Sequence, residues 1–210
     1  MKIDFVSDVA CPWCAVGLAA LEQALQRIGP DIDVELHFQP FELNPDMAPE
    51  GEDAMQHLAR KYGRSPEELL ASRETIRQRG ADEGFAFGTR SRIWNTFDAH
   101  RLLHWAGLQS AAAQRSLKVA LLKAYHGQGE NPGSSEVLLR LVAELGLDVD
   151  SARTMLQSGQ YAEEVRALER RWHSLGITAV PSMIVNDRHL IQGGQPSQMV
   201  EQALRQLAAG

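Results

Sequence analysis

The only two cysteines of the chain, Cys11 and Cys14, follow directly after the apolar run 2–7. Apolar residues recur at helical spacing over 14–28, so a short strand is predicted to lead into a helix that begins at the cysteine pair. Pro12 suits the first helical position, because its φ is fixed and its missing N–H would have no partner there. The sequence therefore predicts Cys11 as the N-cap, with its sulfur facing free backbone N–H groups.

The two thiols are expected to differ in reactivity. A cysteine at a helix N-terminus is stabilised as the thiolate, with a pKa of roughly 3.5 to 7.5 instead of about 8.5. We predict that Cys11 is an exposed nucleophile and that Cys14, one turn further in, is a buried thiol that resolves a mixed disulfide. The nearby Asp8 carboxylate would raise the pKa of Cys11, so the sequence leaves the direction of the net shift open.

The order of the predicted elements indicates an α/β fold with a long insertion. After the first helix, further elements are predicted at 32–38 (strand), 163–175 (helix), 180–185 and 189–191 (strands), and 196–207 (helix). Between them lie short amphipathic helices and no strand signals. This order is that of a thioredoxin fold with an inserted all-helical domain. We predict a thioredoxin-like domain over 1–50 and 160–210 and a helical insertion domain over 51–159.

Local signals support several element boundaries. Ser65, followed by Pro and two Glu, predicts a capping box at a helix start. Asn95 with Asp98 predicts a similar start, and Asn186-Asp187 predicts a hairpin turn. The chain is thus expected to be folded along its whole length.

Charge and composition exclude two classes of partner. The formal net charge is −6 and the basic residues are scattered, which argues against nucleic-acid binding. No run of uncharged residues is long enough for a membrane helix, and Asp4 and Asp8 interrupt the apolar stretch that a secretory signal would need. We therefore expect a cytoplasmic protein. In that reducing compartment a cysteine pair is expected to be catalytic or metal-binding.

A zinc site is the first alternative to a catalytic pair. His100 and His104 are four residues apart on a predicted helix, so both could bind one metal together with the cysteines. Their long separation from Cys14 is unlike compact zinc modules. We predict no metal site, and we interpret His100 as structural. Two unrelated buried cysteines are the second alternative.

Further motifs accompany the cysteine pair: Ser7-Asp8, Pro40-Phe41, Leu43-Asn44-Pro45, the run 95–106 (NTFDAHRLLHWA) and the run 176–181 (GITAVP). With the Cys-Pro-Trp-Cys motif they resemble the FrnE-like, cytoplasmic branch of the DsbA family, over essentially the whole chain. This resemblance implies a thiol-disulfide oxidoreductase with a thioredoxin fold, an inserted helical domain and no tightly bound cofactor. Its substrates would be disulfides or thiols of proteins or small molecules.

The resemblance also implies roles for particular residues. Cys11 and Cys14 would be catalytic, Pro181 would be a cis-proline facing them, and Val180 would offer backbone groups to an extended substrate. Pro12 and Trp13 would complete the substrate-binding surface.

The related 2-hydroxychromene-2-carboxylate isomerases and kappa-class glutathione transferases usually carry Ser in place of the first cysteine. With both cysteines present, disulfide exchange is the favoured function. A glutathione-dependent isomerase or transferase is the alternative. The sequence specifies neither the redox direction nor the oligomeric state.

A glutathione site is predicted at Gly194, Gln195 and Ser197, which precede the last helix. Free backbone N–H groups there would bind a carboxylate, and the two polar side chains would add donors. In glutathione-binding relatives this turn receives the γ-glutamyl end. A plain hairpin-to-helix connection is the equally weighted alternative. Some FrnE-like proteins bear an additional cysteine pair that this chain lacks, so glutathione or a thioredoxin system is expected to recycle the active site.

Overall fold

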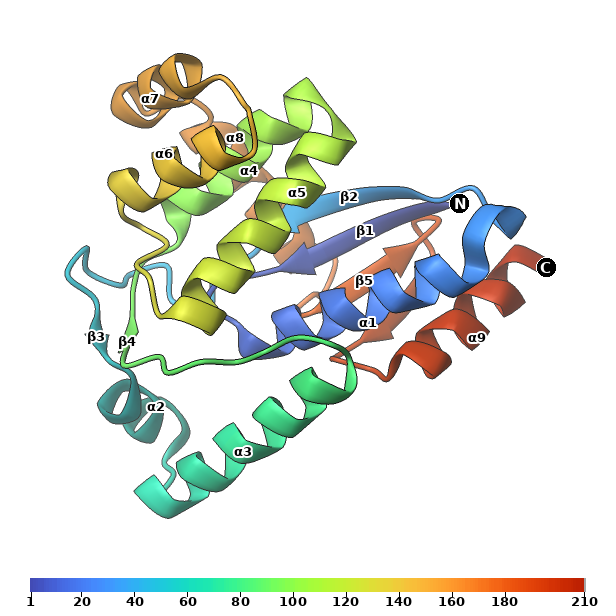
Figure 1. The fold of residues 1–210 in the computed structure, drawn as a ribbon, viewed down its shortest axis with the longest axis horizontal. Helices are drawn as coiled ribbons and strands as arrows, with labels where there is room; N and C mark the ends of the chain where they lie inside the picture. Colours follow the sequence, from blue (N-terminus) through green and yellow to red (C-terminus); the bar gives the residue numbers. More distant parts are fainter. Residues whose placement is uncertain (210) are drawn as a thin grey trace.

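The computed structural model describes residues 1–209 and has a four-stranded mixed sheet at its centre (Figure 1). The strands lie in the order β2 (Glu35–Pro40), β1 (Lys2–Ser7), β5 (Ser182–Val185) and β6 (His189–Gln192). β1 runs parallel to β2, whereas β5 is antiparallel to both β1 and β6. The hairpin between β5 and β6 turns at Asn186-Asp187, as predicted, with φ values of 51° and 57°.

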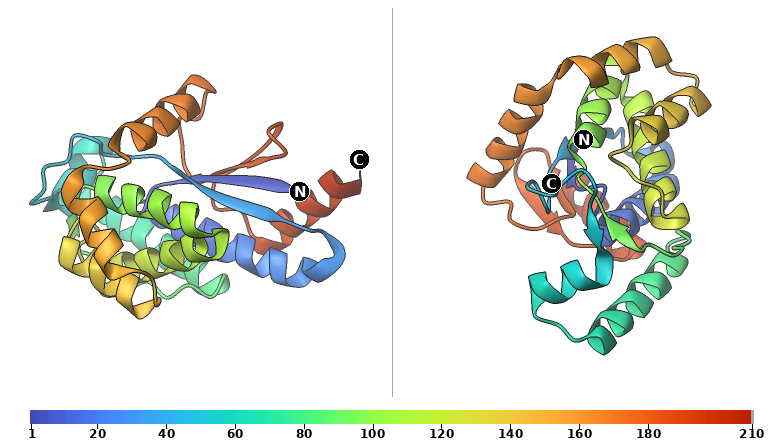
Figure 2. Two further views of the ribbon diagram at one scale, coloured as in Figure 1. Left: turned by 90° about the horizontal axis from the view of Figure 1, so that it is seen from above. Right: turned by 90° about the vertical axis from the view of Figure 1, so that its left-hand side faces the viewer.

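Helices cover both faces of this sheet. α1 (Pro12–Ile28) and α9 (Ser197–Ala209) lie side by side on one face, and α8 (Ala162–Ser174) crosses the opposite face (Figure 2). The side chains of β1 alternate accordingly, because Phe5 packs with the core under α1 and α9, whereas Val6 packs with Trp172 of α8. The predicted α/β, thioredoxin-type architecture is confirmed.

The insertion between β2 and α8 is helical, as predicted, with one addition. Its elements are β3 (Glu52–Asp53), α2 (Ala54–Tyr62), α3 (Pro66–Asp82), β4 (Arg92–Ile93), α4 (Phe97–Gln109), α5 (Ala111–Leu122), α6 (Ser135–Glu144) and α7 (Val149–Ser158). The expectation of an all-helical insertion is corrected by the antiparallel pair of β3 and β4. Two residues per strand are too few to show a period of two in the sequence.

Two short helical turns complete the chain. η1 (Gly29–Asp31) follows α1, and η2 (Lys123–Gly127) continues α5 as a π-helical turn. The capping box at Ser65 is confirmed. The N-cap of α4 is Thr96 instead of Asn95. The side chain of Asn95 accepts a hydrogen bond from the Phe97 N–H at 2.8 Å. No helix within residues 1–209 combines the length and apolarity that crossing a bilayer requires.

Gln114 of α5 fixes the insertion against the open edge of the sheet. β2 is an edge strand, so the backbone groups of Phe38 that point away from β1 need partners. The Gln114 side chain accepts the Phe38 N–H at 3.1 Å and donates to the Phe38 carbonyl at 3.2 Å. This amide therefore imitates a neighbouring strand at one position and anchors α5 on β2.

The helical core and the sheet core interlock beside the cysteine pair. Val9 and Ala10 of the β1–α1 loop pack into the helical core, and Leu122 of α5 packs into the sheet core. The division into 1–50 with 160–210 and 51–159 stays a prediction. The exchange of residues between the two cores means that the insertion forms one wall of the site described next.

Candidate active site

Cys11 caps α1, as the sequence predicts. Its backbone is extended, with φ −86° and ψ 116°, and Pro12 begins the helix. The Cys11 N–H donates to the Asp8 carbonyl at 3.2 Å, and the Cys14 N–H donates to the Cys11 carbonyl at 3.1 Å. Cys11 therefore lies at the positive end of a 17-residue helix, where a thiolate is stabilised.

The two thiols have opposite pKa shifts. A hydrogen bond from the Cys14 side chain lowers the pKa of Cys11 and, with backbone N–H groups, outweighs the raising effects of burial and of the Asp8 charge. Burial, the hydrogen bond to Cys11 and the charge of Cys11 raise the pKa of Cys14 well above its ordinary value. The sequence left the net shift of Cys11 open, and the structure gives it as downward. Cys11 is the residue better suited to be the nucleophile.

Cys11 is more enclosed than the sequence predicts. Its exposed fraction is 5%, and that of Cys14 is 0%. The expectation of an exposed Cys11 is wrong because α2, α3 and β4 of the insertion cover the start of α1. Cys11 instead faces a cavity of about 280 Å³. A substrate must enter this cavity to reach the sulfur.

The Val180-Pro181 peptide bond is cis, as predicted, and lies against the cysteine pair. The Cys11 thiol points to the Val180 carbonyl with a distance of 3.7 Å from sulfur to oxygen. Gly17 of α1 permits this approach, because a Cβ at that position would lie 2.8 Å from Cγ of Pro181. Sequence reasoning missed Gly17, although a glycine inside a predicted helix indicates close packing.

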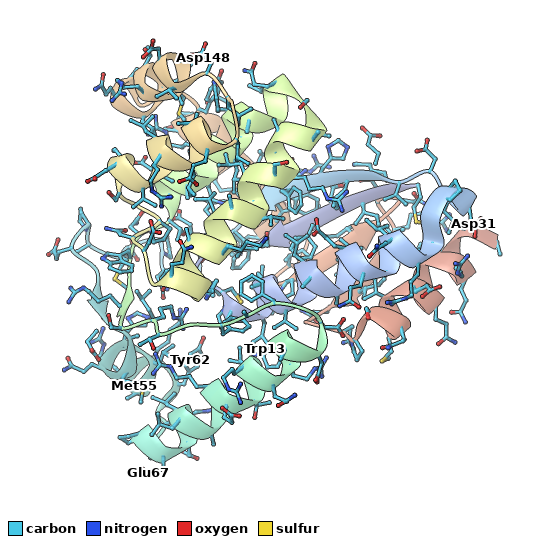
Figure 3. The ribbon with its side chains drawn as sticks, viewed as in Figure 1. Trp13, Asp31, Met55, Tyr62, Glu67 and Asp148 are labelled. Carbon is cyan, nitrogen blue, oxygen red and sulfur yellow. The ribbon has the colours of Figure 1, made fainter. Side chains whose placement is uncertain are left out.

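Trp13 forms part of the cavity wall beside Cys11. Its side chain is half-buried, and it lies along the same flank of the molecule as α3 and Tyr62 (Figure 3). The backbone of Gly194 supports the indole, since a Cβ there would lie 3.0 Å from Cε3 of Trp13. Pro12 also lines the cavity. Pro12 and Trp13 thus line the same cavity as Cys11, and their role in substrate binding stays a prediction.

The cavity is strongly basic. Among its lining residues are four cationic side chains and no carboxylate, although the whole chain carries a net charge of −6. The cations donate to neutral acceptors: Lys61 to the Leu43 carbonyl and the Asn44 side chain, Arg64 to Ser72, Arg73 to the Arg90 carbonyl, and Arg90 to the Ala10 carbonyl. Their positive charge is therefore available to a ligand.

Asp8 organises the loop that carries Cys11. Its exposed fraction is 0%, and it accepts hydrogen bonds from the N–H groups of Ala10 (3.0 Å) and Leu43 (2.7 Å) and from Thr96 Oγ1 (2.8 Å). His100 Nε2 lies 3.4 Å from the same carboxylate. Burial raises the pKa of Asp8, but His100 and the backbone donors together lower it. Asp8 is therefore an anion that joins the cysteine loop to α4.

Two further residues of the insertion hold the same loop. Arg90 donates to the Ala10 carbonyl at 3.0 Å, and His126 of η2 lies with Nε2 2.8 Å from the Val9 carbonyl. Burial and the charge of Arg90 lower the pKa of His126 well below its ordinary value, so it is a neutral donor. Sequence reasoning gave neither residue a role, because no local pattern links them to the cysteines.

The predicted glutathione site is not free to bind an anion at Ser197. The Ser197 N–H donates to Glu83 Oε1 at 3.0 Å, and the residue is 2% exposed. Gln195 donates to the Gln192 carbonyl, and the Gly194 carbonyl accepts from Arg79. The expectation of free N–H groups is therefore corrected, because a carboxylate from the end of α3 already caps α9.

The two histidines of the zinc alternative have different environments. His100 is buried against Asp8, and the His104 ring lies 5.1 Å from that of Tyr161. Within residues 1–209 no three His, Cys, Asp or Glu side chains are grouped as metal ligands would be. The structure instead gives His100 a contact with the loop of Cys11.

Glu42, which follows β2, and Glu169 of α8 form a pair of buried carboxyl groups. Arg166 of α8 donates to both Glu42 and Glu169, which are each 6% exposed. Burial and the neighbouring charge of Glu169 raise the pKa of Glu42 to about 8, although Arg166 opposes this shift. The folded protein therefore holds a proton on Glu42 at pH values where the unfolded chain has lost it.

This proton gives a pH dependence of stability. Above the ordinary pKa of 4.5 only the folded state keeps the proton, so the contribution to the free energy of unfolding falls as the pH rises from 4.5 towards 8. We expect Glu42→Gln to melt at about the wild-type temperature at pH 5 and roughly 2–4 °C above it at pH 9, the shift that about 1 kcal/mol produces at this size. Thermal melts at both pH values test this. A difference that is the same at pH 5 and pH 9 would contradict it.

The comparisons with known proteins agree with this geometry. Residues 2–205 match the family model described as a DSBA-like thioredoxin domain. The chain belongs to this family. The resemblance to the DsbA family of thiol-disulfide oxidoreductases inferred from the sequence is thereby confirmed.

Three relatives illustrate the breadth of the match. A probable DsbA oxidoreductase from Streptomyces coelicolor is 35% identical, with a TM-score of 0.90 over 98% of this chain and 89% of that one. The uncharacterized protein YwbO of Bacillus subtilis is 28% identical over 97% of this chain and 96% of its own. A 2-hydroxychromene-2-carboxylate isomerase shares the fold, with 16% identity and a TM-score of 0.76 over 99% of this chain and 97% of that one.

Proposed function

We propose that the protein exchanges disulfides through Cys11 and Cys14, acting on disulfides or thiols of proteins or small molecules. The observation that carries the proposal is the opposite pKa shift of two thiols at one helix N-terminus. A low-pKa thiol attacks and leaves readily, whereas a high-pKa thiol stays protonated until it is needed. Two thiols whose pKa values differ in this way suit a two-step exchange.

The steps follow from the positions of the groups. The Cys11 thiolate attacks a substrate disulfide, one substrate sulfur leaves as a thiolate, and the other forms a mixed disulfide with Cys11. The Val180 backbone, 3.7 Å from the Cys11 sulfur, offers hydrogen-bonding groups to the bound substrate. Cys14 then loses its proton and attacks the Cys11 sulfur, and the second substrate sulfur leaves. The substrate gains two electrons, and the cysteine pair is oxidised to a disulfide.

The lining of the cavity favours a small anionic thiol as the partner that reduces the oxidised cysteine pair again. Four cations and no carboxylate line about 280 Å³ in front of Cys11. Glutathione has the carboxylates and the thiol that this lining suits, and it would act as a cosubstrate without tight binding. A cytoplasmic location, where such thiols are abundant, fits this role.

Arg64 provides a test of whether the cavity selects anionic disulfides. It lines the cavity, but it makes no hydrogen bond to the loop that carries Cys11 and donates to Ser72 instead. We expect Arg64→Gln to raise the KM for oxidised glutathione about 3- to 10-fold, with little change in the KM for the neutral bis(2-hydroxyethyl) disulfide. Arg60→Gln is the matched control, since Arg60 lies four residues before Arg64, in the last turn of α2, but pairs with Glu52 outside the cavity. Equal changes for both disulfides would refute the selection, and absence of turnover in the wild-type protein would refute the function itself.

A further inference from the structure

A second cavity, of about 400 Å³, lies beside the open edge of β2. Its walls are β2 and the consecutive helices α4 and α5, with Leu168 of α8 (Figure 1). It shares no lining residue with the cavity in front of Cys11, and no step of the proposed exchange uses it. Its volume lies within the range of cavities that bind small molecules.

The second cavity has an open end and a closed end. At the turn between α4 and α5, Leu108 is 60% exposed, and Ala111 is also exposed. Further along the same two helices the lining residues become buried, and His100 and Lys118 at the other end are 2% and 1% exposed. Seven residues separate Ala111 from Lys118, so α5 rises about 10 Å between the two ends. A ligand would therefore enter beside Leu108 and extend inwards to Lys118.

Lys118 is an unpaired cation at the closed end. A lysine is almost never fully buried without a partner, because removing its charge from water is costly. Within residues 1–209 it makes no hydrogen bond, and Asp8, Cys14 and Cys11 act on it only through their charges. Asp8 does not line the cavity, and its carboxylate already accepts the hydrogen bonds described above. The amine is therefore available to an anion that enters the cavity.

The rest of the lining favours a ligand with one negative charge and an apolar chain. Three aliphatic side chains line the cavity: Leu103, Leu108 and Leu168. Within residues 1–209 the only carboxylate of the lining is that of Glu35, which is exposed and pairs with His37 at 2.9 Å. Burial lowers the pKa of His104, so its ring adds no charge at pH 7. The single buried cation and the leucines therefore define the chemistry of the ligand.

We propose that this cavity binds a medium-chain aliphatic monocarboxylate, whose carboxylate pairs with Lys118 and whose chain lies along the leucines towards the turn between α4 and α5. The rise of about 10 Å along α5 matches an extended chain of about eight carbons. Burial of the chain favours binding, and the ion pair offsets the cost of desolvating both charges. The inference is independent of the proposed function, because binding here involves neither cysteine.

Isothermal titration calorimetry with octanoate at pH 7 tests the site, and octanamide, which has the same chain and no charge, is the matched probe. We expect Lys118→Met to weaken octanoate binding about 10-fold or more, the effect of losing a hydrogen bond between charged groups, and to change octanamide binding by less than about 2-fold. Lys123→Met, which removes an exposed lysine directly after α5, is the control variant and should change neither.

Leu108→Glu tests the same site without removing a buried side chain, so it decides if Lys118→Met does not fold. Leu108 is exposed at the open end, and a carboxylate there should repel octanoate and weaken its binding about 3-fold or more. Leu175→Glu is the matched control, because it changes a leucine that is 62% exposed and lies outside the cavity. It should leave octanoate binding unchanged.

Modification of Cys11 with N-ethylmaleimide separates this cavity from the basic cavity of the active site. The modified wild-type protein should bind octanoate as tightly as the unmodified protein, because the two cavities share no residue. Loss of binding after modification, octanamide binding as tight as that of octanoate, or octanoate binding that no folded variant weakens would overturn the proposal. A wild-type protein that binds no octanoate would also overturn it. None of these results depends on turnover of a disulfide, so they leave the proposed function to its own test.

Discussion

Cys11→Ser is expected to reduce disulfide exchange by roughly 10³-fold or more, and Cys14→Ser is expected to trap the substrate as a mixed disulfide. A serine at position 11 cannot form the low-pKa anion that attacks the disulfide. With Cys14 replaced, Cys11 still attacks, but no second thiol lies beside it to release the product. Mass spectrometry of each variant after exposure to oxidised glutathione should show an adduct on Cys14→Ser that dithiothreitol removes, and none on Cys11→Ser.

Cys14→Ala is the matched control for the trap, since it lacks the thiol and cannot replace its hydrogen bond with a hydroxyl. It should trap the same adduct as Cys14→Ser. A glutathione-dependent isomerase or transferase requires only the residue at position 11. Full multiple-turnover activity in both Cys14 variants would therefore contradict disulfide exchange and favour that alternative.

Asp8→Asn is expected to have the largest effect on stability. An amide in place of the completely buried carboxylate offers one oxygen and an NH₂ group to the N–H and O–H donors around it. Loss of such partners costs about 3 kcal/mol, or roughly 6–12 °C in melting temperature at this size. The penalty should shrink as the pH falls below 3.8, because Asp8 contributes its stability only while it is ionised.

The same variant should make Cys11 more acidic. The Asp8 charge raises the pKa of Cys11, so its removal should lower that pKa further. Thermal melting and the pH titration of thiolate absorbance near 240 nm measure the two effects. Asp46→Asn, an exposed position without such contacts, should change stability by less than about 0.5 kcal/mol. An Asp8→Asn protein as stable as this control, or with a higher Cys11 pKa, would contradict the role of Asp8.

The sequence predicted those features that depend on neighbouring residues. Helical periodicity and Pro12 placed Cys11 at the N-cap of α1. The alternation over 32–38 predicted the strand that the structure has at 35–40. The capping box of α3 was predicted from four consecutive residues. In each case the signal and the structure involve the same few positions.

The errors and omissions arose where the partner is distant in the chain. Glu83 caps α9 from 114 positions away, so the N–H of Ser197 looked free in the sequence. Gln114 lies on α5, where periodicity shows which face is buried but not which strand that face meets. Recognition of the family supplied the cis Val180-Pro181 bond, which no local pattern requires.

Pulse alkylation of the reduced wild-type protein with iodoacetamide at pH 7 tests the central claim most directly, with peptide mass spectrometry to locate the modified thiol. Two thiols with opposite pKa shifts, only one of which lines the cavity, predict rapid modification of Cys11 while Cys14 remains unmodified. Equal rates at the two cysteines, or faster modification of Cys14, would contradict the assignment of Cys11 as the nucleophile.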